Sequence, residues 1–180
     1  GYHREWHPGS HTLFLASRFD DTLTRTDPSA VITTLNKNAA GAVTGVTPLL
    51  FDLDYRRELE GYSAELQHLL KSGDHSFIVG SRYQWADVDS TATLLRSPVA
   101  FPPIFATPPS AQSFDQSLDR FNTYAYYGWD ILDNLQVWGG ISYDHLDYPT
   151  NSEIPPLTTS QSSESQVSPK VGFRWDPSEE

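Results

Sequence analysis

A long amphipathic hairpin, residues 121–149, is the feature that most restricts the fold of this chain. Its second arm, LQVWGGISYDHLDYP, alternates apolar or small residues with more polar ones. Successive side chains of a β-strand point to opposite sides of a sheet, so this period of two predicts a strand with one apolar face. The first arm is rich in Tyr, Thr and Phe, which favour strands, and Asp133-Asn134 supplies a tight turn. Arms of about fourteen residues, against the ~5–6 residues usual for strands, are typical of a membrane-spanning hairpin.

The same alternation recurs in several other segments of the chain. They are residues 12–24, 54–70, 76–89 and 166–175, with a short stub at residues 1–6. Together with the two arms of the hairpin, they predict an all-β fold. We expect an antiparallel, up-and-down meander of about seven long strands that forms an open segment of a transmembrane β-barrel.

The connections between these segments alternate in length. Short turns are expected near residues 7–11, 71–74, 131–134 and 176–178, and long loops near residues 25–51, 90–113 and 150–165. In a meander, alternate connections emerge at the same rim. Outer-membrane barrels have this asymmetry, with short periplasmic turns and long extracellular loops. Nothing in a soluble sandwich requires short and long connections to lie at opposite ends.

The alternation also divides the side chains into two sets. We expect the apolar set to face lipid: Leu13, Leu15, Phe77, Val79, Tyr83, Val137, Ile141, Val171 and Phe173. We expect the polar set to face the lumen: Arg18, Arg82, Gln84, Arg120, Asn122, Lys170 and Arg174. A polar lumen can contact a plug or a solute. A wide barrel also has a polar, water-filled interior irrespective of what it transports.

Aromatic residues are expected to form two girdles at the levels of the lipid headgroups. Trp6, Phe77, Trp129 and Trp175 fall near the short-turn rim, and Phe19, Trp85 and Tyr143 fall towards the other rim.

Composition excludes several other classes of protein. A formal net charge of -11 argues against nucleic acid, because a phosphate-binding face needs clustered Lys and Arg. The chain has no cysteine, which rules out disulfides and thiolate metal sites. No apolar run approaches the ~18–20 residues of a spanning helix. This length criterion does not apply to a membrane-spanning strand, in which only every second residue must be apolar.

Three segments resemble the membrane barrel of TonB-dependent outer-membrane receptors. They are ELEGYSAELQHLLKSGDHSFIVGSRYQ, RFNTYAYYGWDILDNLQVWGGISYDHLDYP and VSPKVGFRWDPSEE. The last is similar to a strand and turn that often reads S-P-K-x-G-x-x-W-x-P in this family. The likeness covers most of the chain and rests on diffuse strand motifs.

This resemblance implies a role in ligand uptake. Family members have a 22-stranded barrel closed by an N-terminal plug, and they move ferric chelates, cobalamin or glycans with energy from an inner-membrane partner. The plug and the energy-coupling box are not found in this sequence, so we expect residues 1–180 to be a partial barrel. The resemblance implies the outer membrane of a Gram-negative-type bacterium. The expected partners are its lipid, the remainder of the barrel, a plug and an inner-membrane energy-coupling protein.

Two groups of polar residues could bind metal ions. His3, His7 and His11 would align as metal ligands on a helix, but Pro8-Gly9 between them argues for a turn. Six carboxylates near the expected long loops could bind calcium or form a solvated acidic rim: Asp52, Asp54, Asp87, Asp89, Asp144 and Asp147. No nucleophile motif, phosphate loop or dinucleotide fingerprint is present, so we expect no enzyme and no cofactor.

Two alternatives stay open at this point. One is a soluble all-β carbohydrate-binding module with Trp85, Trp138 and Tyr148 as stacking platforms. The other is a porin or export barrel, which has the same strand pattern. In a barrel the apolar face is a continuous exposed belt, whereas in a sandwich it is buried against a second sheet.

Overall fold

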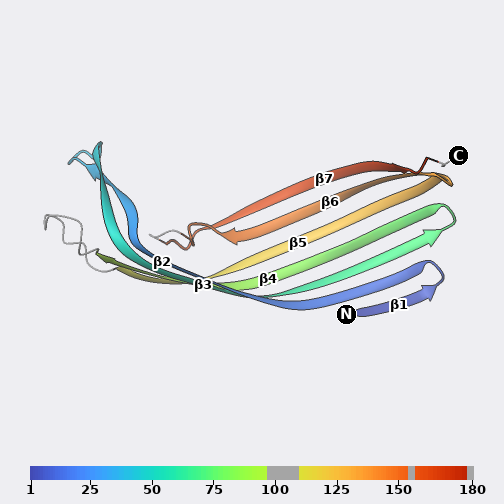
Figure 1. The fold of residues 1–180 in the computed structure, drawn as a ribbon, viewed down its shortest axis with the longest axis horizontal. Coiled ribbons are helices and arrows are strands. Elements are labelled where there is room, and N and C mark those ends of the chain that lie inside the picture. Colours follow the sequence, from blue (N-terminus) through green and yellow to red (C-terminus); the bar gives the residue numbers. More distant parts are fainter. Residues whose placement is uncertain (97–109, 154–156, 178–180) are drawn as a thin grey trace.

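The protein forms one curved antiparallel sheet (Figure 1). The computed structural model describes residues 1–96, 110–153 and 157–177. Seven strands follow one another in the sheet in chain order, and each pairs with its sequence neighbours. Their bounds are β1 Tyr2–His7, β2 Ser10–Lys37, β3 Val43–Ser72, β4 His75–Arg96, β5 Ser110–Leu132, β6 Leu135–Pro149 and β7 Gln161–Trp175. The expected all-β, open meander is confirmed.

The short turns lie together at one end of the sheet (Figure 1). They contain Pro8-Gly9, Gly73-Asp74 and Asp133-Asn134, as the sequence predicts. Gly9 has a φ of 85° and Gly73 a φ of 56°, in the left-handed region that glycine adopts without steric cost. The described part of the chain contains no helix long and apolar enough to cross a membrane.

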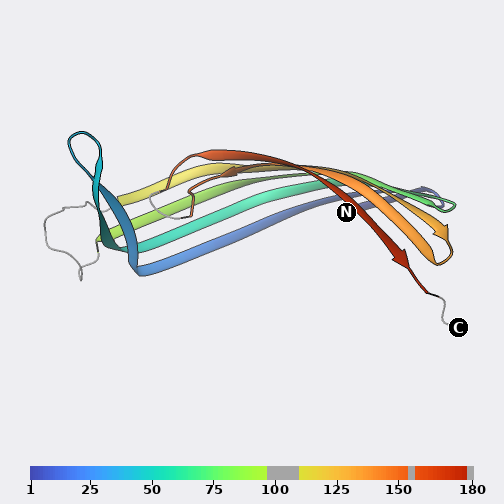
Figure 2. The same cartoon turned by 90° about the horizontal axis from the view of Figure 1, so that it is seen from above.

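The long loop expected at residues 25–51 is wrong, because most of it is paired strand. Strand β2 continues to Lys37, β3 begins at Val43, and only residues 38–42 form the turn. A register shift between Asp27 and Ala30 accommodates Pro28, which lacks a backbone N–H. Beyond this bulge, residues 30–37 pair with residues 43–51. The tip of this hairpin bends away from the plane of the sheet (Figure 2).

The other two expected loops are also shorter than predicted. Strand β4 continues to Arg96 and β5 begins at Ser110, while residues 97–109 lie outside the described part. Strand β7 begins at Gln161, so the connection from β6 covers residues 150–160, of which 154–156 are outside the described part. Tertiary pairing and burial extend these strands, which local sequence alone does not indicate.

The pairing register defines two faces of the sheet. Residues directly opposite one another on paired strands lie on the same side. The apolar face contains even-numbered residues of β2 before the bulge that follows Asp27, even-numbered residues of β3 and odd-numbered residues of β4 to β7. The polar face contains the alternate residues.

This register corrects three of the expected orientations. Leu15 lies opposite Glu65, which lies opposite Arg82, so Leu13 and Leu15 are on the polar face. Arg18 lies opposite Tyr62 and is on the apolar face. Alternation within β2 was recognised correctly, but both of its faces mix apolar and polar residues. Only the pairing of β2 with β3 shows which face of β2 continues the apolar face of the sheet.

Candidate functional site

The apolar face is a broad exposed surface. Seven of the expected lipid-facing residues share it: Phe77, Val79, Tyr83, Val137, Ile141, Val171 and Phe173. Val171 is 87% exposed, Phe173 73% and Ile141 52%. The described strands form a single sheet, so no second sheet among them covers this face.

Aromatic rings border this face at two levels. At the short-turn end, the His75 ring stacks on Tyr127 and Trp129, with centroids 5.9 Å away in each case. At the other level, Trp85 stacks on Tyr62 at 5.7 Å and on Tyr83 at 5.5 Å. Phe19, which we expected in the second girdle, lies instead on the polar face opposite Gly61.

The distance between these levels matches a bilayer. On β5, Trp129 marks the first level, and Asp119, which lies opposite Trp85, marks the second. This part of β5 is about 33 Å long at ~3.3 Å per residue. A strand tilted by ~40° would then rise about 25 Å, the height of the apolar band of outer-membrane barrels. The strands continue beyond it, as their sequence length predicts.

Polar side chains on the apolar face are paired with one another. Ser81 Oγ donates to Thr123 Oγ1 at 3.0 Å, and Thr123 Oγ1 donates to the Gly80 carbonyl at 3.1 Å. Trp6 Nε1 donates to Thr12 Oγ1, which lies 2.9 Å from His68 Nδ1. Such pairing lowers the cost of placing these groups in hydrocarbon.

Carboxylates gather on the apolar face beyond the second aromatic level. Asp20, Glu60 and Asp87 form one cross-strand row, and Glu58, Asp89 and Asp115 form the next. Like charges directly opposite each other are destabilising. Desolvation, a hydrogen bond to Asp115, and the charges of Asp115, Asp87 and Glu58 raise the pKa of Asp89.

The six carboxylates singled out in the sequence do not form one group. Asp52, Asp54, Asp87, Asp89 and Asp147 are on the apolar face, whereas Asp144 is on the polar face. Within the described residues, no group of three or more His, Asp or Glu side chains could hold a metal ion. The three N-terminal histidines lie at a strand pair: His3 Nε2 and His11 Nδ1 are 3.1 Å apart, and His7 contacts the Pro8 carbonyl.

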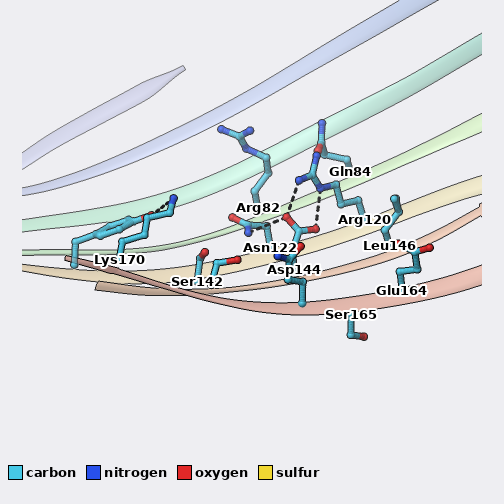
Figure 3. Close-up of a pocket in the computed structure, with 13 residues that line it drawn as sticks. Arg82, Gln84, Arg120, Asn122, Ser142, Asp144, Leu146, Glu164, Ser165 and Lys170 are labelled. Atoms are coloured by element: carbon cyan, nitrogen blue, oxygen red, sulfur yellow. Dashed lines mark hydrogen bonds and ion pairs between the residues drawn. The ribbon is translucent and has the colours of Figure 1, made fainter. Parts of the chain in front are cut away.

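A hollow of about 860 Å³ lies on the polar face of β4 to β7 (Figure 3). Its lining contains five of the expected lumen-facing residues, namely Arg82, Gln84, Arg120, Asn122 and Lys170. Arg174 is on the same face but lines a separate, smaller hollow near the Asp133-Asn134 turn. Arg18 is on the other face, as described above. We call the larger hollow the polar pocket.

One ion-pair network joins β3, β4 and β5 beside the polar pocket. Arg82 donates through Nε and Nη2 to Glu65 Oε2, at 3.0 and 2.6 Å. Tyr124 OH donates to Glu65 Oε1 at 2.8 Å and accepts from Gln67 Nε2 at 3.1 Å. Both carboxylate oxygens of Glu65 are therefore hydrogen-bonded.

A second network lies within the polar pocket itself. Arg120 binds Asp144 in a bidentate pair, Nε to Oδ1 at 2.9 Å and Nη2 to Oδ2 at 2.6 Å (Figure 3). Asn122 Nδ2 donates to the same Oδ2 at 3.2 Å. Lys170 Nζ donates to Tyr126 OH at 3.3 Å. No carboxylate of the described residues forms an ion pair with Lys170, so it is a cation that a solute could meet.

Sequence reasoning missed several residues of these networks. Glu65, Tyr124 and Tyr126 were not singled out, and Asp144 was grouped with the acidic rim. Their positions in the strand alternation place them on the polar side, but the partners come from neighbouring strands. Only the register brings Glu65 opposite Arg82 and Asn122 opposite Asp144.

Aromatic rings on the polar face lie against glycines of the next strand. A Cβ added at Gly140 would collide with Tyr126, and one added at Gly172 would collide with Trp138. Tyr126 is directly opposite Gly140, and Trp138 is directly opposite Gly172. Each ring therefore occupies the space that a side chain at the facing glycine would need.

The residues expected for carbohydrate stacking are split between the faces. Trp85 is on the apolar face, while Trp138 and Tyr148 are on the polar face. Trp138 lies over Gly172, and Tyr148 OH donates to Glu164 Oε1 at 2.8 Å. The three rings therefore do not form one platform.

No model of a known protein family, curated protein or solved structure matches this chain.

Proposed function

We propose that the chain forms part of the wall of an outer-membrane β-barrel in a Gram-negative-type bacterium. The observation that carries this proposal is the contrast between the two faces of one sheet. One face is an exposed apolar belt between two aromatic levels, and the other holds paired charges around a polar pocket. A wall between lipid and water requires this combination.

Two further features support the proposal. Backbone groups inside a bilayer must be hydrogen-bonded, and the strands pair continuously through the apolar belt. The tight turns lie at one end, and β2 and β3 continue into a long hairpin at the other. We assign the hairpin end to the cell exterior and the tight turns to the periplasm.

Within this class, we propose a receptor resembling the TonB-dependent family, which takes up a metal chelate, vitamin or glycan. The strand motifs described above support this assignment. The polar pocket supplies hydrogen-bonding groups and the Lys170 cation towards a solute or a plug. The remaining barrel strands, a plug and an inner-membrane energy-coupling protein are the partners of this proposal.

Adjacent residues of β7 allow a direct test of the lipid-facing assignment. Residues 1–180 have no cysteine, so Val171→Cys or Lys170→Cys adds a single thiol to this part of the chain. A fluorophore is attached there in the full-length protein reconstituted in bilayers, with any cysteine outside these residues replaced. Lipids that carry nitroxide quenchers should quench the fluorophore at position 171 much more than at position 170. Equal quenching at both positions would overturn the membrane-wall assignment.

The transport part needs a separate experiment. Uptake of a candidate ferric chelate, cobalamin or oligosaccharide by cells with the full-length protein should stop when the proton-motive force is collapsed. Uptake that continues unchanged would contradict an energy-coupled receptor and would favour a porin.

A further inference from the structure

Two histidines of the N-terminal strand pair meet on the polar face of the sheet. His3 of β1 lies opposite Leu13 of β2, and Glu5 lies opposite His11. His3 and His11 are therefore diagonal neighbours on the same side, close enough for long side chains to touch. His3 Nε2 and His11 Nδ1 are 3.1 Å apart, and the ring centroids are 5.2 Å apart. We call these two residues the histidine pair.

The third N-terminal histidine does not belong to the pair. The register shifts between Glu5 and His7, and His7 lies opposite Ser10. Ser10 is an even-numbered residue of β2, so this irregularity turns His7 towards the apolar face, where its Nδ1 lies 3.2 Å from the Pro8 carbonyl. The equal spacing of the three histidines in the sequence thus gives two neighbours and one residue apart from them.

The separation of the two ring nitrogens suits one shared metal ion. Zn²⁺ binds imidazole nitrogen at about 2.0–2.1 Å. Two nitrogens 3.1 Å apart, each at that distance from one ion, subtend an angle of about 95–100° at the ion. This angle lies between the ~90° of an octahedral site and the ~109° of a tetrahedral site. In the structure the nitrogens face each other as a hydrogen-bonded pair, so each ring must turn slightly to direct its lone pair at the ion.

An ion can reach the histidine pair, and the charge beside it is favourable. His3 is exposed and His11 is half-buried. The described residues directly opposite them are Leu13, Glu5 and Leu69, so no cation faces either ring. Glu5 adds a negative charge beside His11, which favours a cation. Since the described residues offer no group of three ligands, water would fill the remaining coordination positions.

The histidine pair joins the shortest strand to the rest of the sheet. Strand β1 has six residues, forms an edge of the sheet and pairs only with β2. An ion held by one nitrogen from each strand is a cross-link that forms only when the two strands are paired in this register. Because the unfolded chain lacks this arrangement, binding of the ion should stabilise the pairing of β1 with β2.

We propose that His3 and His11 form a two-histidine site for a divalent cation of the Zn²⁺, Ni²⁺ and Cu²⁺ class, and that the ion clamps β1 to β2. Imidazole suits these ions, whereas Ca²⁺ and Mg²⁺ prefer oxygen ligands. Without the ion, one ring donates its N–H to the other. When the ion binds, His3 Nε2 and His11 Nδ1 both supply lone pairs, and the former donor ring carries its proton on its other nitrogen. This inference does not depend on the proposed barrel function.

Metal titration of the full-length protein in detergent tests the site. ZnCl₂ is added in a calorimeter, in a buffer that does not chelate metal, to the parent and to His3→Gln and His11→Gln. Glutamine keeps a hydrogen-bonding side chain but removes the imidazole ligand. Each variant should weaken the binding of one Zn²⁺ equivalent by about tenfold or more, because changing a residue that merely supports a metal ligand already costs about 10–100-fold. MgCl₂ should give the same heat for the parent and both variants.

His7→Gln is the matched control, since it removes a histidine of the same strand from the other face. It should bind Zn²⁺ like the parent. Circular dichroism in detergent checks that every variant keeps the β-structure of the parent. Unchanged Zn²⁺ binding in His3→Gln would overturn the proposal, as would an equal loss in His7→Gln.

Hydrogen exchange tests the clamp separately from the binding. Saturating Zn²⁺ should slow amide exchange in residues 2–7 of the parent and should have no such effect in His11→Gln. Binding of Zn²⁺ by the histidine pair without slower exchange in β1 would show a metal site that does not clamp the strand, and this would overturn the second part of the proposal.

Discussion

At the level of single residues, adjacent positions of β6 have opposite surroundings. Ile141 is 52% exposed on the apolar face, and Ser142 lines the polar pocket. Arginine at position 141 should destabilise the protein by about 2–4 kcal/mol, the cost of a cation facing lipid near the midplane, whereas Ser142→Arg should cost little. Equilibrium refolding into bilayers measures both values, and equal costs would reject the assignment of the faces.

The two consecutive glycines of β6 provide a second matched pair. A Cβ at Gly140 would collide with the Tyr126 ring, whereas one at Gly139 would meet only the Lys170 carbonyl oxygen at 3.8 Å. Gly140→Ala should therefore lower the free energy of unfolding by about 1–3 kcal/mol through overpacking. Gly139→Ala should have a much smaller effect.

Truncation of the ring identifies the cause. If the collision with Tyr126 destabilises Gly140→Ala, then Gly140→Ala/Tyr126→Ala should recover part of the loss in a double-mutant cycle. Strict additivity of the two changes would argue against the ring-on-glycine contact.

Asp89 provides a pH-dependent prediction outside the proposed membrane-spanning segment. Its raised pKa means that the folded protein binds the Asp89 proton more tightly than the unfolded chain does. The free energy of unfolding should therefore fall as the pH rises from about 3.9, the ordinary pKa of Asp, through the raised value. Asp89→Asn removes this loss, so the variant should be more stable than the parent at pH 7.

Urea unfolding in detergent at two pH values checks this sign. The advantage of Asp89→Asn at pH 7 should shrink at pH 3.5, where the parent carboxyl is also protonated. Asp133→Asn, in a tight turn at the opposite end, is the control. A parent that gains stability between pH 3.5 and pH 7 relative to Asp89→Asn would contradict the prediction.

At the level of elements, β3 connects the two ends of the molecule. It extends from Val43, beside the tip of the protruding hairpin, to Ser72, beside a tight turn. Its central part carries apolar-face residues and Glu65, and its outer part supplies Phe51, Leu53 and Tyr55 to the buried apolar cluster that contains Leu157. One strand thus contributes to the exposed apolar face, the polar network and the apolar cluster.

The two ends of β3 allow the orientation to be tested. Lys37 lies beside the hairpin turn, and Lys71 lies beside the tight turn at the other end. Trypsin added to intact cells should cleave at Lys37 and spare Lys71, because only the hairpin end is expected to be outside. Cleavage should not be early at Arg25, which lies in the paired part of β2. Protection of Lys37 together with cleavage at Lys71 would reverse the orientation.

At the level of the whole molecule, the sheet is open and its apolar face is uncovered. Strands β1 and β7 form its edges, and each has backbone groups that pair with no other strand of the described sheet. Unpaired edges cost several kcal/mol per group in hydrocarbon and promote association in water. In either environment, further strands or further copies of the chain would satisfy these edges.

This openness predicts how residues 1–180 behave alone. The isolated polypeptide should self-associate or stay partly unfolded in detergent-free buffer, since it exposes both the edges and the apolar belt. Light scattering coupled to size-exclusion chromatography measures its mass, and detergent should reduce the association. A monodisperse, cooperatively unfolding monomer in buffer would contradict the membrane assignment.

The sequence by itself determined the fold class, the tight turns and the alternation within each strand. These depend on local chemistry: β-branched and aromatic residues at a period of two, and glycine or Asp-Asn where the chain reverses. For β4 to β7 one face is clearly more apolar, so the residues expected to share it, such as Val79 and Ile141, were grouped correctly.

Only the tertiary structure decided how the strands combine. Strand β2 has apolar residues on both faces, so its pairing with β3 was needed to place Leu15 with Glu65 and Arg18 with Tyr62. The outer parts of β2 to β5 read as loops because Pro, Gly and Ser interrupt their pattern. They are strands because cross-strand hydrogen bonds and the burial of Leu157 compensate for weak local preference. Such contacts join residues far apart in the chain, and no local pattern encodes them.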